Sequence, residues 1–222
     1  FSNPQRAFKH LTDYQNLIPE FRVVGDFPVE THIISALWIN MVGYKFDVCL
    51  GTHAYGSRLK TIHTKTDHVQ PEKSFHIKAI GSFEPYFEPY QKWRNDGLNA
   101  IRTELEQKRQ VLAVSLDLKS YYHQIDPLFI ANKEFQKDLG LSLTECEKLF
   151  TQQLANFLSE WSERSSTFAN SLQIEQNEED KKNIKGGLVI GLSASRVIAN
   201  VLLYKWDKLI TERLTPVYYG RY

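Results

Sequence analysis

The sequence predicts an α+β domain in which helices pack beneath a β-sheet. Three features support this fold class: an apolar, branched run at 111–118, several segments whose apolar residues recur at helical spacing, and a strand-like run at 216–222. Strand and helix signals in this mixed order are typical of α+β domains. With 222 residues, 42% of them hydrophobic, the chain is long enough to bury a substantial core.

Charge and cysteine content exclude several classes of protein. The charges of the 27 basic and 26 acidic residues nearly cancel, which excludes a uniformly basic surface for binding nucleic acid but allows a local basic groove. Two cysteines, Cys49 and Cys146, are too few for a disulfide scaffold or a four-cysteine zinc site, and they suit a reducing compartment. The longest apolar run, around 33–42, is too short to cross a bilayer, so we expect no membrane contact.

The ends of the chain suggest a piece of a longer protein. It begins at Phe1, its only methionine is Met41, and it stops at Tyr222 directly after a strand-like run. A native gene product starts with methionine and rarely ends inside an element. We therefore expect this to be an internal piece.

Helical spacing predicts two helices in the first half of the chain. One spans 31–50, begins after Pro28, and is expected to bury an apolar stripe made of Ile33, Ile34, Leu37, Trp38, Met41 and Val42. The second spans 96–107 and is more exposed, with Leu98, Ile101 and Leu105 on one face. We expect these helices to belong to the first of two structural regions.

The second half begins with the run VLAVSLDL at 111–118, which predicts a strand buried on both faces. Ser142 and Glu145 form a capping-box pattern that predicts the start of a helix reaching about Trp161. A further helix is expected at 195–210 and a strand or hairpin at 216–222. The polar run at 174–185 predicts an exposed loop, with disorder as the alternative.

Asp117 is the strongest single candidate for a catalytic or metal-binding residue. It lies at the end of the predicted apolar strand, where an unpaired carboxylate is costly unless it meets a cation or hydrogen-bond donors. A divalent metal is one solution; capping of the next turn or pairing with an arginine is the other. Asp126, which precedes a proline, is more typical of a helix N-cap than of a second ligand.

Residues 116–126, LDLKSYYHQID, resemble the first catalytic box of reverse transcriptases. The resemblance implies that Asp117 binds two Mg²⁺ or Mn²⁺ ions, that the Leu118 carbonyl assists one of them, and that Tyr121 and Tyr122 face the nucleotide. In this family the position of Tyr122 excludes a 2′-hydroxyl sterically. Ordinary packing is the alternative for both tyrosines.

Residues 186–203, GGLVIGLSASRVIANVLL, are similar to the second box of group II intron and retron reverse transcriptases. The resemblance places Gly191 and Ser195 along the nucleotide and Gly187, Arg196 and Asn200 on the template and primer side. Valine and isoleucine replace the common Pro-Gln before Gly191, and Arg196 replaces a common proline. These changes resemble the bacterial defence-associated branch, which includes abortive-infection enzymes. A loop leading into an ordinary helix is the alternative.

Weaker resemblances lie elsewhere in the chain. Residues 216–222, PVYYGRY, look like the approach to the third box, in which Tyr222 is the first residue and two aspartates would follow. Residues 21–38 and 53–60 are similar to fingers segments, which implies that Arg22 and Arg58 face phosphates; solvated surface charges are the alternative. The aromatic run at 83–93 suits either stacking on bases or packing.

Together these resemblances imply a right-hand polymerase fold, with fingers at 1–108 and part of a palm at 109–222, the antiparallel palm sheet being floored by helices. The implied function is RNA-directed or template-atypical DNA synthesis from dNTPs in bacterial antiviral defence, in the cytoplasm. The template would be RNA, DNA or a companion noncoding RNA, and oligomerisation stays open. The alternatives are a catalytically degenerate module that binds nucleic acid or assembles a complex, and a metal-dependent phosphohydrolase using Asp117 and Asp126.

Overall fold

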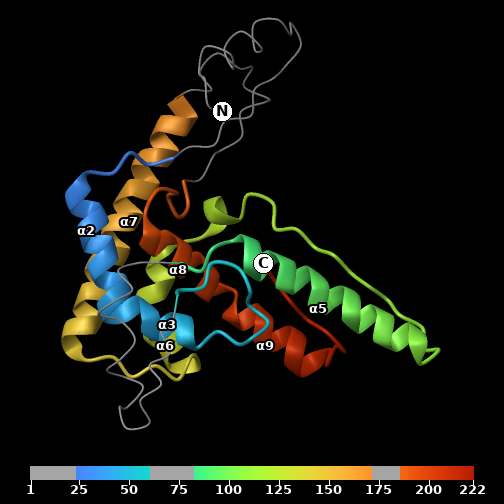
Figure 1. The fold of residues 1–222 in the computed structure, drawn as a ribbon. Coiled ribbons are helices and arrows are strands. Elements are labelled where there is room, and N and C mark those ends of the chain that lie inside the picture. Colours follow the sequence, from blue (N-terminus) through green and yellow to red (C-terminus); the bar gives the residue numbers. More distant parts are fainter. Residues whose placement is uncertain (1–23, 61–82, 172–185) are drawn as a thin grey trace, which may run out of the picture.

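The computed structural model describes residues 24–60, 83–171 and 186–222 (Figure 1). Over these ranges the chain is mostly helical, with three isolated β-bridges and no sheet. The predicted α+β fold with an antiparallel palm sheet is therefore wrong for the residues described. Arg22 and the polar loop at 174–185 lie outside them.

The first helical run follows Pro28, as predicted. It consists of α2 (Val29–Trp38), a π-helical turn η1 (Ile39–Gly43) and α3 (Tyr44–Val48). The buried face includes Trp38, Val42 and Phe46. A π-turn inserts an extra residue into the helical ladder, so the faces before and after it do not follow one simple 3.6-residue stripe.

The predicted buried stripe of this helix is mostly wrong. Four of its members are about half exposed: Ile33, Ile34, Leu37 and Met41. Trp38 and Val42 are buried as predicted, and the Trp38 indole donates to Thr151 at 3.1 Å. The buried face also carries Ser35, which was not predicted and whose hydroxyl accepts a hydrogen bond of 2.8 Å from the Ala194 backbone. Partners on neighbouring helices therefore select the face that apolar spacing alone does not.

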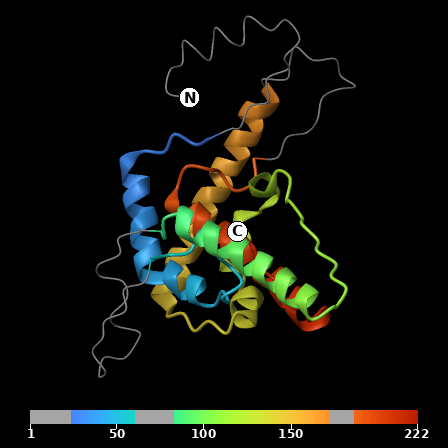
Figure 2. The same ribbon diagram turned by 45° about the vertical axis from the view of Figure 1, so that its right-hand side comes forward.

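Helix α5 (Phe87–Glu106) covers the predicted helix at 96–107 up to its last residue, and none of the α5 residues is buried. Beyond its far end the chain returns toward the core as an extended run, which both views show (Figures 1 and 2). This run contains 111–118, which was predicted to be a strand buried on both faces. That prediction is wrong: Leu112 is 89% exposed and Leu116 is 74% exposed. A strand is buried only by neighbours, and none of the described segments pairs with this one.

Short 3₁₀ turns and two helices follow the extended run: η2 (Tyr121–Gln124), η3 (Pro127–Ala131), α6 (Lys133–Asp138) and α7 (Glu145–Ser171). Asp126 caps η3 by accepting a 2.9 Å bond from the Leu128 backbone, which confirms the N-cap prediction. The predicted capping box at Ser142 and Glu145 is displaced by two residues. Thr144 and Glu147 form it through reciprocal backbone-to-side-chain bonds of 2.9 and 3.3 Å.

The predicted helix at 195–210 is divided at Leu203 into α8 (Ser193–Leu202) and α9 (Tyr204–Arg213). Helix α8 is largely buried and packs against α2, η1 and α3, while α7 packs against η3 and α2, so the core lies among these elements. The predicted strand at 216–222 makes one parallel bridge, between Arg221 and Ala54. No helix in the described ranges has the length and apolarity needed to span a bilayer.

Candidate functional site

The two segments that resemble catalytic boxes lie against each other. Gly187 has φ +56°, and a Cβ built on it would stand 2.3 Å from the Tyr122 carbonyl oxygen. The same carbonyl accepts a hydrogen bond of 2.8 Å from the Leu188 backbone. The loop that precedes α8 is therefore fitted directly onto the 3₁₀ turn that contains Tyr121 and Tyr122.

The segment that precedes α2 meets the same loop. The Gly25 backbone donates a 2.8 Å bond to the Ile190 carbonyl, and Val24 and Ile190 form a parallel bridge. Gly191 has φ +143°, and a Cβ there would lie 2.6 Å from the Gly25 carbonyl oxygen. Gly25, which lies within the predicted fingers segment at 21–38, thus contacts Gly191, the predicted nucleotide-lining glycine.

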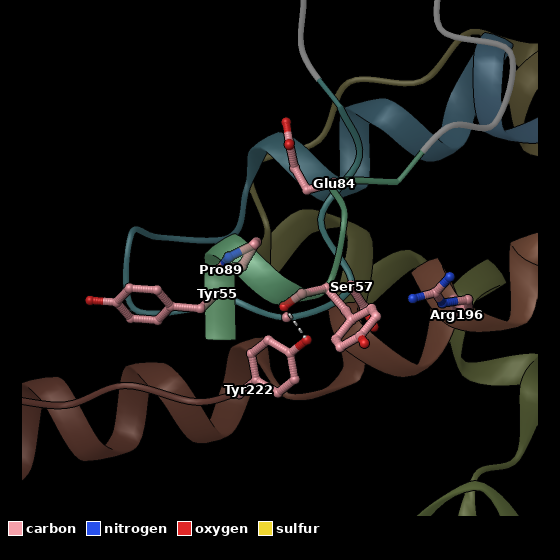
Figure 3. Close-up of a pocket in the computed structure, with 8 residues that line it drawn as sticks. Tyr55, Ser57, Glu84, Pro89, Arg196 and Tyr222 are labelled. Carbon is pink, nitrogen blue, oxygen red and sulfur yellow. Dashed lines mark hydrogen bonds between the residues drawn. The ribbon is translucent and has the colours of Figure 1, made fainter. Parts of the chain in front are cut away.

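A pocket lies where the loop at 51–59, the start of α5, helix α8 and the C-terminal segment meet (Figure 3). Tyr222 reaches across it and donates a 2.8 Å hydrogen bond to the Tyr86 carbonyl. Arg196 enters from α8, with its guanidinium 4.3 Å from the centre of the Phe83 ring. The remaining lining residues are Tyr55, Gly56, Ser57, Glu84 and Pro89.

Arg196 is the cation of this pocket. No ion pair within the described part of the chain uses its guanidinium, which is exposed on α8. Burial raises the pKa of Tyr222 and of Tyr122, and the charge of Arg196 opposes the rise at both. Arg196 is therefore an electrostatic neighbour of a tyrosine from each of two predicted boxes, and both phenols keep their protons near neutral pH.

A buried ion pair fixes the C-terminal segment behind the pocket. Asp207 of α9 is 1% exposed and accepts bonds of 2.7 and 2.8 Å from the Arg221 guanidinium. The Tyr219 hydroxyl donates to the same carboxylate at 2.7 Å. Arg221 also donates to the side-chain oxygen of Asn200 on α8. Because Arg221 directly precedes Tyr222, this network positions the Tyr222 side of the pocket.

Asn200, predicted to face template or primer, is buried. Its amide nitrogen donates to the carbonyls of Gly56 and Ser57 at 3.0 and 3.2 Å. With its oxygen taken by Arg221, the side chain links the C-terminal segment to the loop that lines the pocket. Asn200 thus positions pocket residues and does not line the open space.

Arg58, predicted to face phosphates, also points inward. It forms an ion pair of 3.1 Å with the buried Asp47 and donates to the carbonyls of Gly51 and Ala54 at 3.1 and 3.2 Å. Burial raises the pKa of Asp47, and the charge of Arg58 opposes that rise. These contacts close the loop at 51–59 on itself, so Arg58 organises the loop that presents the pocket residues.

The first-box residues have different surroundings. Asp117 and Leu118 are exposed on the extended run. The half-buried Tyr121 donates a 2.6 Å bond to the Ala199 carbonyl of α8, and the Tyr122 ring lies edge-on to it at 6.1 Å. Tyr121 is therefore anchored by its hydroxyl, whereas Tyr122 contributes a ring to the packing.

Ser195, predicted to line the nucleotide, is buried and donates a 2.9 Å bond to the Val189 carbonyl. The aromatic run at 83–93 packs internally as well as lining the pocket, since the rings of Tyr90 and Trp93 lie 5.3 and 6.2 Å from the Tyr222 ring. The rings of Tyr90 and Trp93 therefore take part in packing, whereas Tyr86 and Phe87 are exposed.

A two-ion metal centre is not complete in the described ranges. They contain no group of three or more histidine, cysteine, aspartate or glutamate side chains that could hold an ion. Asp117 is one exposed carboxylate, and a site that holds two ions needs further ligands close to it. The residues described here therefore do not fit such a centre by themselves.

Sequence reasoning missed the ion pair of Asp207 and Arg221, the most buried one in the described ranges. One signal was present: Asn200 and Asp207 are seven residues, or two turns, apart in the predicted helix at 195–210, a spacing that puts two polar side chains on one helix face. Polar residues on a buried face require partners, so a shared cation could have been expected.

No protein-family model, curated protein or solved structure matches this chain.

Proposed function

We propose that this chain is part of a reverse transcriptase-type DNA polymerase that adds dNTPs to a 3′-hydroxyl, or to a protein hydroxyl, in bacterial antiviral defence. The observation that supports it is the convergence of segments that resemble separate boxes of that family. Tyr122 and Gly187 pack together although they are far apart in the sequence, and Gly56, Arg196 and Tyr222 line one pocket. If these segments resembled the family's boxes only by chance, there would be no reason for them to contact one another.

The pocket has the chemistry of a nucleic-acid-facing surface. Arg196 offers a cation without a carboxylate partner in the described part of the chain, and phosphate contacts of this kind position nucleic acids. Tyr86 is 74% exposed at the pocket edge, and exposed aromatic rings support stacking of bases. In the proposal this pocket holds the template, which is RNA, DNA or a companion noncoding RNA.

Catalysis in this proposal depends on Asp117 and on carboxylates beyond those described here. Mg²⁺ or Mn²⁺ ions would supply activation of the attacking hydroxyl and charge stabilisation of the leaving phosphates. Asp117 would supply one carboxylate. The further ligands would be the aspartates that the resemblance expects after Tyr222.

A second candidate is a non-catalytic module that binds nucleic acid. The observation that favours it is that Asp117 is exposed and belongs to no acidic cluster in the described ranges, whereas the pocket already contains its arginine and aromatic side chains. This candidate needs Arg196 and Tyr86 but does not need Asp117.

Incorporation of each labelled dNTP, with Mg²⁺ and the nucleic acid that copurifies with the whole polypeptide, separates the two candidates. Asp117→Asn is expected to abolish incorporation. The matched control, Asp126→Asn, makes the same change at a carboxylate that caps η3, and it is expected to preserve incorporation.

Incorporation that survives Asp117→Asn in a folded protein contradicts the polymerase assignment. If wild type incorporates nothing but binds labelled single-stranded RNA or DNA, and Arg196→Ala weakens that binding, the module is favoured. Lys205→Ala is the matched control for Arg196, because it removes an exposed cation that contacts Asp138 away from the pocket residues.

A further inference from the structure

The run at 109–118 is extended (Figure 1), and none of the described segments pairs with it. Helix α5 ends at Glu106, and Lys108, two residues farther on, has φ +58°, the left-handed conformation that commonly follows the end of a helix. Within the described part of the protein, residues 110–119 make no backbone hydrogen bond. An exposed strand with free donors and acceptors is a template for pairing with another strand.

The two faces of this run differ. Even-numbered positions form an exposed apolar row: Leu112, Val114, Leu116 and Leu118 are 89%, 69%, 74% and 54% exposed. Odd-numbered positions carry smaller or polar residues, from Val111 to Asp117. Because side chains alternate along a strand, one face of any ribbon built on this run is apolar and the other is mixed.

We propose that this run pairs antiparallel with the same run of a second copy of the chain, centred on Ala113. In that register Arg109 of each copy lies directly opposite Asp117 of the other, so the ribbon carries two cross-strand pairs of opposite charge. Leu112 lies opposite Val114, and the apolar rows of both copies share one face. The charge pattern of the run is thus complementary to itself.

Neighbouring registers lose one or both of these matches. A shift that places Lys108 opposite Asp117 keeps a charge pair but sets the apolar row of one copy against the mixed face of the other. A register centred on Val114 places Arg109 opposite Lys119, where like charges repel. The register centred on Ala113 satisfies both the charges and the apolar faces.

Arg109 can form an ion pair with a second carboxylate. Its ion pair with Glu104, at 2.9 Å, uses Nη1 for both contacts, and its side chain is 61% exposed. The inference goes beyond the proposed function and does not depend on it. Since Asp117 cannot hold a metal ion and pair with Arg109 at once, the oligomeric state is measured in EDTA.

Cysteine crosslinking tests the register. In a Cys49→Ser, Cys146→Ser background, Ala113→Cys places two thiols opposite each other, within the Cα separation of about 4.4–6.8 Å that a disulfide requires. Mild oxidation is expected to give a disulfide-linked dimer. Ser115→Cys is the matched control, because residue 115 lies opposite Val111 and its two copies are too far apart. Equal crosslinking of both variants, or none with Ala113→Cys, overturns the proposal.

Charge reversal tests the energetics by sedimentation equilibrium. Arg109→Asp or Asp117→Arg alone is expected to raise the dimer dissociation constant by about tenfold or more, and the double variant is expected to restore it. Lys108→Glu, which reverses a charge outside the pair, is expected to change it little. The self-pairing proposal is overturned if the wild-type chain stays monomeric, or if the double variant dimerises no more tightly than the single variants. The run would then pair with another segment of the polypeptide.

Discussion

The α-carbon of Gly187 lies against the backbone of Tyr122, so closely that a methyl group on Gly187 would stand 2.3 Å from the Tyr122 carbonyl oxygen. That oxygen accepts the hydrogen bond from Leu188, so it cannot move away without losing a backbone partner. Gly187 also has φ +56°, a conformation that disfavours any side chain. Two independent constraints therefore require glycine at this contact.

Gly187→Ala is expected to lower the free energy of unfolding by about 3 kcal/mol, because it combines a steric overlap with left-handed strain. Urea unfolding followed by far-UV circular dichroism measures the loss. Gly140→Ala is the matched control: Gly140 has φ +71°, but nothing lies within 4 Å of a Cβ built there. It is expected to cost about 1 kcal/mol from backbone strain alone. If the two variants lose the same free energy of unfolding, the loop at Gly187 must shift to accommodate the added methyl group.

Asp207→Asn is expected to lower the free energy of unfolding by about 3 kcal/mol, because it leaves the Arg221 guanidinium without its buried counter-charge. The C-terminal segment should also loosen, which tryptophan fluorescence reports, since the Trp93 ring lies 6.2 Å from the Tyr222 ring. Chemical denaturation and emission spectra of the two proteins give both measurements.

Asp138→Asn is the control for this prediction. Asp138 pairs with Lys205 at 3.2 Å, but its side chain is 54% exposed. Surface pairs of this kind contribute about 0.5 kcal/mol or less. If both variants lose the same stability, the buried pair does not hold the segment in place.

Local patterns predicted most helices but not the faces that they bury. Apolar spacing placed a helix after Pro28 and buried Trp38 correctly, yet it missed Ser35, which is buried because the Ala194 backbone supplies its hydrogen-bond partner. That partner is far away in the sequence, so no local window contains it. The capping box illustrates a smaller ambiguity: two overlapping patterns two residues apart both satisfied the rule.

The prediction of a buried strand at 111–118 was wrong for a different reason. Its composition suits a buried strand, but burial depends on a neighbour, and none of the described segments provides one. The pocket was predictable in part: Arg196 and Tyr222 were singled out from the sequence and do line it. The pairing of Arg221 with Asp207 was not, because the C-terminal segment has no periodicity that would assign its side chains to a face.

Glu147→Gln is expected to remove an acid-dependent part of the stability. Burial of Glu147 disfavours its charge, but the bonds from Lys45 and Thr144 outweigh burial and lower the pKa of the Glu147 carboxyl below its ordinary value of 4.5. A carboxyl whose pKa is lower in the folded state stabilises the fold above its unfolded pKa, and this stabilisation is lost as the pH falls through the folded pKa. The variant should therefore be less stable by about 1 kcal/mol near neutral pH.

Urea unfolding at about pH 7 and about pH 3 checks the sign, because the difference between the two proteins should shrink in acid. Glu145→Gln is the control. This glutamate occupies the same helical turn and pairs with Lys148, but it is exposed, so solvent screens the pair and a smaller effect is expected. A difference between wild type and Glu147→Gln that grows in acid would contradict the assignment.

Tyr122→Ala is expected to narrow the preference for dNTPs over NTPs if the proposed polymerase activity holds. In the proposal the Tyr122 ring occupies the space that a 2′-hydroxyl needs, so truncation removes a clash and leaves bonding groups in place. Total activity should also fall, because the ring packs edge-on against Tyr121. Tyr122→Phe keeps the ring and should keep the preference for dNTPs.

The measurement is the ratio of dNTP to NTP incorporation efficiency at one metal concentration. An unchanged ratio in active Tyr122→Ala protein would show that this ring serves packing alone, and Tyr121, fixed by its 2.6 Å bond to the Ala199 carbonyl, would become the next residue to truncate.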